Sequence, residues 1–133
     1  MLIQPFIQAY VLAVASILDA PVTVVDSNMY RVGGTAEYEG VIGKKVTHSA
    51  FFDRVLKTGK PGFVTNVKKD DACSHCQKRG ECLELADMAY PIFLDGRVAG
   101  LIGLVAFRED ERNRLLRNQE KLGEFLKYMC MLI

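Results

Sequence analysis

The chain has no tryptophan, only four prolines and almost no excess of charge of one sign. Its 17 basic and 16 acidic residues leave a net charge of +1, which gives no electrostatic footprint for nucleic acid. No apolar run approaches the roughly 20 residues that span a bilayer. The first 15 residues also lack the positively charged start of a secretory signal. We therefore expect a single soluble domain in the cytoplasm, with no membrane partner.

Cysteine is also scarce, but three of the four cysteines fall within ten residues. Cys73, Cys76 and Cys82 form a C-x2-C-x5-C group in a polar loop, residues 68–83. A structural cysteine prefers apolar surroundings, whereas thiolates spaced by two residues can turn onto one metal ion. The group therefore predicts a metal site that holds zinc or an iron–sulfur cluster. Reduced or redox-active thiols without a metal are the alternative.

Three thiolates leave one coordination position to be filled. His75 is a candidate, although an imidazole inside the C-x2-C would usually point away from the metal. Cys130 is a second candidate, but its apolar segment already explains it as a buried thiol. A partner chain, a small ligand or a water could also fill this position. The sequence leaves the fourth ligand open.

Hydrophobic periodicity predicts the elements of the first half of the chain. Apolar residues recur at helical spacing from Ile3 to Leu18. Strands are predicted at 22–25 and 29–32, with Gly33-Gly34 as a bulge or turn. A short amphipathic helix at 51–56 follows, and a third strand begins just after it. We expect that helix to end at a left-handed glycine, Gly59.

The second half begins with a hairpin and ends with a helix. Asp95-Gly96 between the apolar runs 85–94 and 97–107 predicts a type I′ turn. The second arm is apolar on both faces, so we expect it in the centre of a sheet. An acidic start and a seven-residue spacing of apolar residues predict one helix over 109–133. That helix could pair with a second copy or pack on its own sheet, and we expect it to continue past residue 133.

The order of elements predicts an α+β fold of PAS/GAF-like type. Residues 1–108 would form one antiparallel sheet of about five strands, packed by the N- and C-terminal helices. Residues 51–61, FFDRVLKTGKP, and 91–104, PIFLDGRVAGLIGL, resemble the helix and the closing hairpin of such domains. With the cysteine loop between them, the whole chain resembles the N-terminal sensory domains of bacterial sigma-54-dependent transcriptional activators.

This resemblance implies a regulatory input domain and no enzyme. In such activators an AAA+ ATPase domain and a helix-turn-helix domain follow the sensor. The chain contains no G-x-x-x-x-G-K-[ST] loop, so ATP, DNA and sigma-54 RNA polymerase would be contacted only through other domains. Residues 109–133 would be a signalling helix, and a homodimer would form through the terminal helices. The signal would be a small ligand, a metal or a redox change.

PAS/GAF-like domains hold small molecules between the sheet and the short helices. Aromatic candidates for such a pocket are Tyr30, Phe51, Phe52, Tyr90, Phe93 and Phe107. Candidates to meet an anionic ligand are Arg31, Thr35, His48 and Arg54. Aromatic residues at such positions are often core, and the polar ones are often surface. His48 near Ser49 and Asp53 lacks a nucleophile-elbow pattern, so we predict no catalytic triad.

A different class of function uses the same cysteines. A small metal-binding or thiol-redox protein would act through Cys73 and Cys76. A thioredoxin-like enzyme, however, places its C-x2-C at the start of a helix after a strand. Here the pair lies in a charged loop between predicted antiparallel strands. The sequence favours the sensory domain.

Overall fold

The computed structural model describes residues 4–46, 49–65 and 84–132. Several predicted site residues lie outside these ranges, namely Cys73, His75, Cys76, Cys82 and His48. The fold and the site are therefore built from the other residues.

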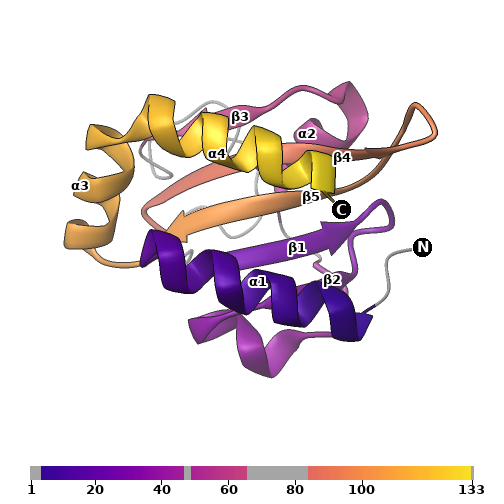
Figure 1. Ribbon diagram of the computed structural model, residues 1–133, viewed down its shortest axis with the longest axis horizontal. Coiled ribbons are helices and arrows are strands. Elements are labelled where there is room, and N and C mark those ends of the chain that lie inside the picture. The colour runs from indigo at the N-terminus through magenta and orange to yellow at the C-terminus, as the bar shows by residue number, and fades with distance from the viewer. Residues whose placement is uncertain (1–3, 47–48, 66–83, 133) are drawn as a thin grey trace.

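A five-stranded antiparallel sheet forms the middle layer (Figure 1). The strand order is β2-β1-β5-β4-β3, and every neighbouring pair is antiparallel. This confirms the predicted α+β sheet, and it confirms that the apolar second arm of the hairpin lies at its centre. The strands are β1 (Val22–Asp26), β2 (Arg31–Gly34), β3 (Gly62–Val64), β4 (Ala86–Leu94) and β5 (Arg97–Ala106).

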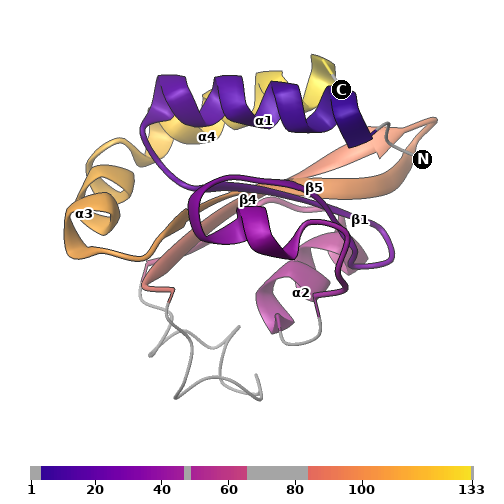
Figure 2. The same cartoon turned by 90° about the horizontal axis from the view of Figure 1, so that it is seen from below.

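Helices cover both faces of the sheet. Two of them, α1 (Gln4–Leu18) and α4 (Gln119–Leu132), lie side by side over one face, whereas α2 (Ala50–Thr58) lies on the other (Figures 1 and 2). The hydroxyl of Tyr10 joins α1 to α4, because it donates to the carbonyl of Met129 at 2.7 Å. The remaining elements are the 3-10 turn η1 (Ala36–Val41) and α3 (Glu109–Arg117), which lies at one end of the sheet.

Because strand side chains alternate between faces, the sheet divides the apolar residues into two clusters. The larger cluster lies under α1 and α4 and includes Leu104 and Leu126. The smaller cluster lies under α2 and contains Phe51, Phe52 and Leu101. The two faces of the sheet therefore differ in how much apolar surface they bury.

The structure confirms two local predictions, the turn at Asp95-Gly96 and the glycine cap at Gly59. Asp95 and Gly96 both have positive φ, at 53° and 76°, which confirms the type I′ turn between β4 and β5. Gly59 has φ of 65° and its N–H donates to the carbonyl of Val55, so it is the predicted left-handed cap of α2. At the other end of α2, the hydroxyl of Ser49 accepts from the N–H of Phe52.

The second strand was expected at 29–32, and that prediction is wrong by two residues. The backbone N–H groups of Asn28 and Tyr30 both donate to a carboxylate oxygen of Asp26, at 2.9 and 3.0 Å. This side chain prolongs the turn and delays the strand. Gly33-Gly34 therefore lies inside β2 and is no turn, and the pairing of β1 with β2 shifts by one residue next to Gly33, which fits the bulge alternative. A Cβ at Gly33 would lie 3.0 Å from two side chains of α1, which explains the glycine there.

The single terminal helix that we expected is two helices, α3 and α4, which meet at Asn118. The backbone N–H and the side-chain amide of Asn118 both donate to the carbonyl of Arg114, at 3.1 and 3.0 Å. Such local bonding competes with continuation of a helix. Leu115 and Leu126 are buried within the domain, so both helices pack on their own sheet. Pairing with a second copy stays a prediction.

Candidate functional site

A cluster of polar side chains is buried on the α2 face of the sheet. Thr23 and Asp87 alternate along their strands with residues of the larger apolar cluster, so they point to the opposite face. Arg31 reaches the same place from β2, because its Nε donates to the hydroxyl of Thr23 at 2.8 Å. Tyr38 from η1 and Glu84 complete what we call the polar cluster.

The contacts within the polar cluster are specific. The guanidinium of Arg31 lies over the ring of Tyr38, 4.4 Å from its centroid. The hydroxyl of Tyr38 donates to a carboxylate oxygen of Glu84 at 2.6 Å. Burial lowers the pKa of Arg31, and the charges of Tyr38 and Glu84 oppose that shift. Burial also raises the pKa of Tyr38 well above its ordinary value, so its hydroxyl keeps the donated proton.

Asp87 is the unusual member of the polar cluster. It is only 3% exposed, and within the described part of the chain its Oδ1 has no hydrogen-bond partner. Burial, followed by the charge of Glu84 and a hydrogen bond to it, raises the pKa of Asp87 well above its ordinary value. An unpaired buried polar group costs about 1–3 kcal/mol. An atom of this kind points to a missing partner.

The polar cluster adjoins the cysteine loop along the chain. Glu84 follows Cys82 by two residues, and its side chain is fixed by Tyr38. On the other side of the loop, the carbonyl of Thr65 accepts from Nε of Arg112 in α3 at 2.8 Å. The described chain on both sides of 66–83 is therefore held by named contacts.

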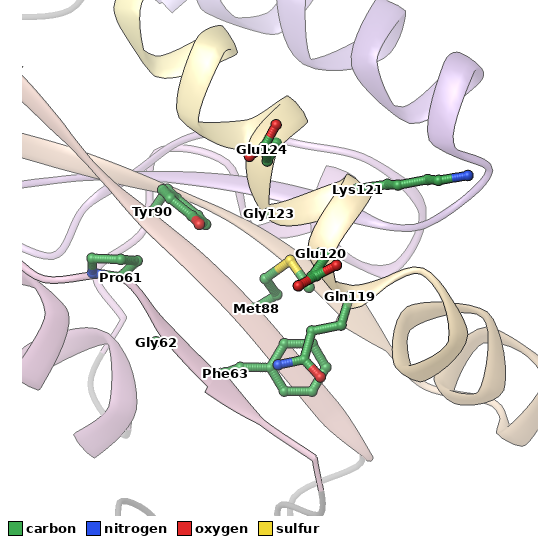
Figure 3. Close-up of a pocket in the computed structure, with 10 residues that line it drawn as sticks. All are labelled: Pro61, Gly62, Phe63, Met88, Tyr90, Gln119, Glu120, Lys121, Gly123 and Glu124. Carbon is green, nitrogen blue, oxygen red and sulfur yellow. The ribbon is translucent and has the colours of Figure 1, made fainter.

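A cavity of about 660 Å³ lies on the other face, between α4 and the strands β3 and β4 (Figure 3). Phe63, Met88 and Tyr90 supply its apolar wall, and Glu120 and Glu124 supply carboxylates from α4. This is the side of the sheet opposite to the one where we expected a pocket. With Lys121 as the one basic lining residue, the two carboxylates leave the lining net negative, which disfavours an anionic ligand.

The six aromatic pocket candidates do not gather around one cavity. Phe51 and Phe52 are fully buried in the smaller apolar cluster, with their ring centroids 5.9 Å apart. Tyr30 and Phe93 are 46% and 50% exposed. Tyr90 lines the cavity described above.

Phe107 packs against the ring of Tyr38, with centroids 5.5 Å apart, and so borders the polar cluster. Aromatic residues fill core positions in strands and helices whatever the function, which is why composition could not separate them. A ligand-binding role for these six residues stays a prediction.

Of the three described residues expected near an anionic ligand, Arg31 joins the polar cluster, whereas Thr35 and Arg54 do not. Thr35 is buried, but its hydroxyl accepts from the N–H of Val22 at 3.0 Å and so pairs β1 with the chain after β2. Arg54 is exposed on α2, and His48 lies outside the described residues. Sequence reasoning missed Asp87, although an acid inside the apolar run 85–94 was a visible signal.

The candidate fourth ligand Cys130 lies on the α4 side. It is half-buried beside the larger apolar cluster, and its thiol donates to the carbonyl of Tyr90 at 3.8 Å. Burial raises the pKa of Cys130 to about 12, so the thiol is neutral at pH 7. These contacts describe a core cysteine, and its role as a ligand stays a prediction.

The described residues contain neither a metal-binding cluster nor a membrane-spanning helix. Within 4–46, 49–65 and 84–132, no three histidine, cysteine or acidic side chains converge as a metal site. None of the helices in these ranges is long and apolar enough to cross a membrane.

No protein-family model matches the chain. A curated relative from Escherichia coli (strain K12), UacR, has been assigned as a uric acid sigma-54-dependent transcriptional regulator. It is 30% identical over 130 residues, which cover 97% of this chain and 22% of that protein. The chain thus spans about a fifth of the length of this relative.

Solved structures share the fold at low sequence identity. The GAF domain of A. aeolicus nlh2 in an inactive state has a TM-score of 0.61 and 15% identity, covering 99% of this chain and 86% of that chain. A GAF domain of a Coxiella burnetii phosphoenolpyruvate-protein phosphotransferase has a TM-score of 0.63 and 14% identity, covering 96% and 80%.

The type II free methionine-R-sulfoxide reductase of Thermoplasma acidophilum has a TM-score of 0.64 and 12% identity, covering 97% of this chain and 90% of that chain. The same fold therefore occurs in GAF domains of other proteins and in an enzyme, so the fold alone does not decide the function. The chain has the GAF fold and is similar, over nearly all of its length, to one part of a sigma-54-dependent transcriptional regulator.

Proposed function

We propose that the chain is the signal-input domain of a sigma-54-dependent transcriptional regulator. The observation that supports this most strongly is the match of 97% of the chain to only 22% of such a regulator, in a chain with a GAF fold. An AAA+ ATPase domain and a DNA-binding domain would lie elsewhere in the natural protein. DNA and sigma-54 RNA polymerase would be reached through those domains, and the proposed location is the cytoplasm.

The cysteine loop is the proposed receiver of the signal. Cys73, Cys76 and Cys82 would hold zinc or an iron–sulfur cluster, and a change in metal or redox state would be the signal. The loop leads directly into Glu84, which bonds to Tyr38. Through Tyr38 and Arg31, the polar cluster connects the start of β4 to η1, β2 and β1. A change at the loop would thus reach three strands.

A small molecule is the second candidate signal. The E. coli relative is assigned to uric acid, so uric acid is the first compound to test. The buried guanidinium of Arg31 is the described group best suited to an anionic ligand. Isothermal titration of wild type and Arg31→Met with uric acid would decide, since equal heats for both would exclude this site.

We also propose a homodimer through the terminal helices. Helix α1 contains no charged residue, and its Leu12 and Ile17 are 48% and 69% exposed. On the neighbouring helix α4, Tyr128 and Met131 are 59% and 73% exposed. Exposed apolar side chains on two adjacent helices, of which α1 has no charged residue, favour burial against a like surface.

The alternative function is thiol or metal chemistry carried out by the chain itself. The observation in its favour is the shared fold with the free methionine-R-sulfoxide reductase. The regulator similarity covers the same residues at higher identity, so we rank this function second. Turnover of free methionine sulfoxide by the reduced chain, lost on Cys76→Ser, would reverse that ranking.

The test of the input-domain proposal uses the natural regulator that contains this chain. ATP hydrolysis would be measured anaerobically after iron or zinc loading and after chelation, with and without residues 1–133. We expect metal state to change ATPase activity in the intact protein only. The triple variant Cys73→Ser, Cys76→Ser, Cys82→Ser should behave like the chelated protein. An intact regulator whose ATPase ignores both the metal and the deletion would contradict the proposal.

A further inference from the structure

The proposed function makes no use of the cavity between α4 and the strands β3 and β4 (Figure 3). Its volume of about 660 Å³ falls within the roughly 300–1,000 Å³ that is typical of sites for small molecules. All ten residues that line the cavity belong to the described part of the chain. The chemistry of its walls can therefore be read residue by residue.

One wall of the cavity is apolar and is built by the sheet. Phe63 of β3 pairs with Met88 of β4, and Tyr90 follows Met88 by two residues, so these three side chains lie on the same face. Met88 is buried, whereas Phe63 and Tyr90 are only half-buried. Their rings offer apolar surface to the body of a ligand, and an aromatic ring also attracts a cation placed over its face.

The opposite wall is the first half of α4, which supplies half of the lining residues. Gly123 lies where this helix meets Tyr90, because a Cβ at Gly123 would come 3.0 Å from the Tyr90 hydroxyl oxygen. Glycine is a poor residue for the interior of a helix, and this close approach explains its presence. The glycine lets the Tyr90 side chain lie against the backbone of α4, so helix and sheet share the cavity.

The charge on the helical wall is negative. Glu120 and Glu124 are exposed, and among the described residues neither forms an ion pair. The helix dipole accounts for an acid in the first turn, Glu120, but not for Glu124 one turn later. The charge of Glu124 adds to the effect of burial in raising the pKa of Tyr90, so this carboxylate acts on the aromatic wall. Lys121 extends away from Phe63 and Tyr90 (Figure 3).

These two walls disfavour three kinds of occupant. An anion would meet a lining with net negative charge. A divalent metal ion takes several oxygen ligands, and within the described residues no three acidic, histidine or cysteine side chains converge. A neutral apolar molecule would remove water from the carboxylates and supply no charge in return. An organic cation meets both the charge and the apolar surface.

We propose that this cavity binds a small organic cation, with an ammonium group at the carboxylates of Glu120 and Glu124 and an apolar body against Phe63, Met88 and Tyr90. The inference is independent of the cysteine loop and of the signal proposed for it. The two carboxylates stand four residues apart on one side of α4, where like charges repel, and an ammonium group would offset that repulsion. The occupant would bridge α4 and the sheet.

The test is an NMR titration of the 133-residue chain with three probes of similar size and different charge. These are phenethylammonium, the neutral phenethyl alcohol and the anionic hydrocinnamate. Shifts of the backbone amide signals locate each probe, and their dependence on concentration gives its affinity.

Three variants accompany the wild type in this titration. The double variant Glu120→Gln, Glu124→Gln removes both charges at nearly constant size. Its matched control, Glu37→Gln with Glu39→Gln, removes two exposed carboxylates from η1, which contributes no residue to the cavity. Tyr90→Leu removes an aromatic ring from the apolar wall. Thermal melting shows whether each variant folds.

We expect phenethylammonium to shift the amide signals of Gly123 and Glu124 and to bind more tightly than the alcohol or the anion. The double variant at Glu120 and Glu124 should bind it roughly five- to thirtyfold more weakly, the effect of losing two exposed ion pairs. The η1 control should bind it like wild type. Tyr90→Leu should bind it about two- to fivefold more weakly, as expected for one exposed cation–π contact. Added salt should weaken binding more in wild type than in the double variant.

Three outcomes would overturn the inference. Equal affinities for phenethylammonium and phenethyl alcohol, unchanged in the double carboxylate variant, would make the cavity an apolar groove that recognises no charge. Shifts spread over the whole surface, or an equal loss of affinity in the η1 control, would mean general attraction of a cation to acidic side chains. If phenethylammonium shifts no amide signal around the cavity, no small amine binds there.

Discussion

The two faces of the sheet bury different kinds of side chain. Under α1 and α4, apolar side chains from four strands and three helices form the larger cluster. On the α2 side, a smaller apolar cluster shares the sheet with Thr23, Arg31, Tyr38 and Asp87. The first face stabilises the domain by excluding water from apolar surface. The second face keeps buried polar groups, of which the Oδ1 of Asp87, unpaired among the described residues, costs stability.

One sheet can hold both the larger apolar cluster and the polar cluster, because these lie on opposite faces. β4 and β5 contribute to both faces, and side chains in a strand alternate. Met88 thus belongs to the larger apolar cluster while its neighbour Asp87 belongs to the polar cluster. A change at one side can alter the site with little loss of the core on the other.

The largest effect should come from the apolar face. Leu126→Ala removes a fully buried side chain of α4 and should lower the free energy of unfolding by about 2 to 5 kcal/mol. Urea denaturation of the metal-free chain measures this. The control is Leu12→Ala on exposed α1 surface, expected within about 0.5 kcal/mol of wild type. Equal losses in both variants would mean that the larger cluster is not the main source of stability.

A smaller effect is expected on the polar face. Tyr38→Phe keeps the ring under Arg31 and removes only the hydrogen bond to Glu84. A hydrogen bond to a charged group contributes about 1.5 kcal/mol or somewhat more, so we expect a loss of that order in the same urea experiment. A loss larger than that of Leu126→Ala would show that the polar cluster stabilises the domain more than the apolar one.

A further prediction concerns Cys130 on the apolar face, which should make the free energy of unfolding depend on pH. Burial raises the pKa of Cys130 from 9.0 to about 12. The unfolded chain therefore releases this proton first, and the free energy of unfolding falls as pH rises through that interval. Relative to Cys130→Ala, wild type should lose less than about 1 kcal/mol near pH 9.5. Parallel stability curves for the two proteins between pH 8 and pH 10.5 would contradict the buried thiol.

The smallest effect on folding should come from the outer surface of the apolar face. Leu12→Glu introduces charge on the exposed side of α1 and should change the free energy of unfolding by no more than about 0.5 kcal/mol. It should nevertheless dissociate the proposed dimer in sedimentation experiments. Arg54→Glu, exposed on α2, is the control and should remain dimeric. A wild-type chain that sediments as a monomer would remove the dimer from the proposal.

Local signals in the sequence predicted most of the elements. The apolar second arm of the hairpin was placed correctly in the centre of the sheet, and Asp95-Gly96 gave the correct turn. Errors occurred where a side chain bonds to nearby backbone. Asp26 prolongs a turn, and Asn118 interrupts a helix that heptad spacing extended too far. Hydrophobic periodicity carries no information about such hydrogen bonds between a side chain and nearby backbone.

The candidate site also has one part that the sequence predicts and one part that it does not. The cysteine spacing and its chemistry can be read directly from residues 73–82, and so can the resemblance to regulator input domains. The polar cluster could not be predicted from the sequence, because Arg31, Tyr38 and Asp87 come from three distant parts of the chain. The pairing of β2 with β1, of β1 with β5 and of β5 with β4 brings those parts together. Burial then decides which acid lacks a partner, since that depends on every neighbour packed around it.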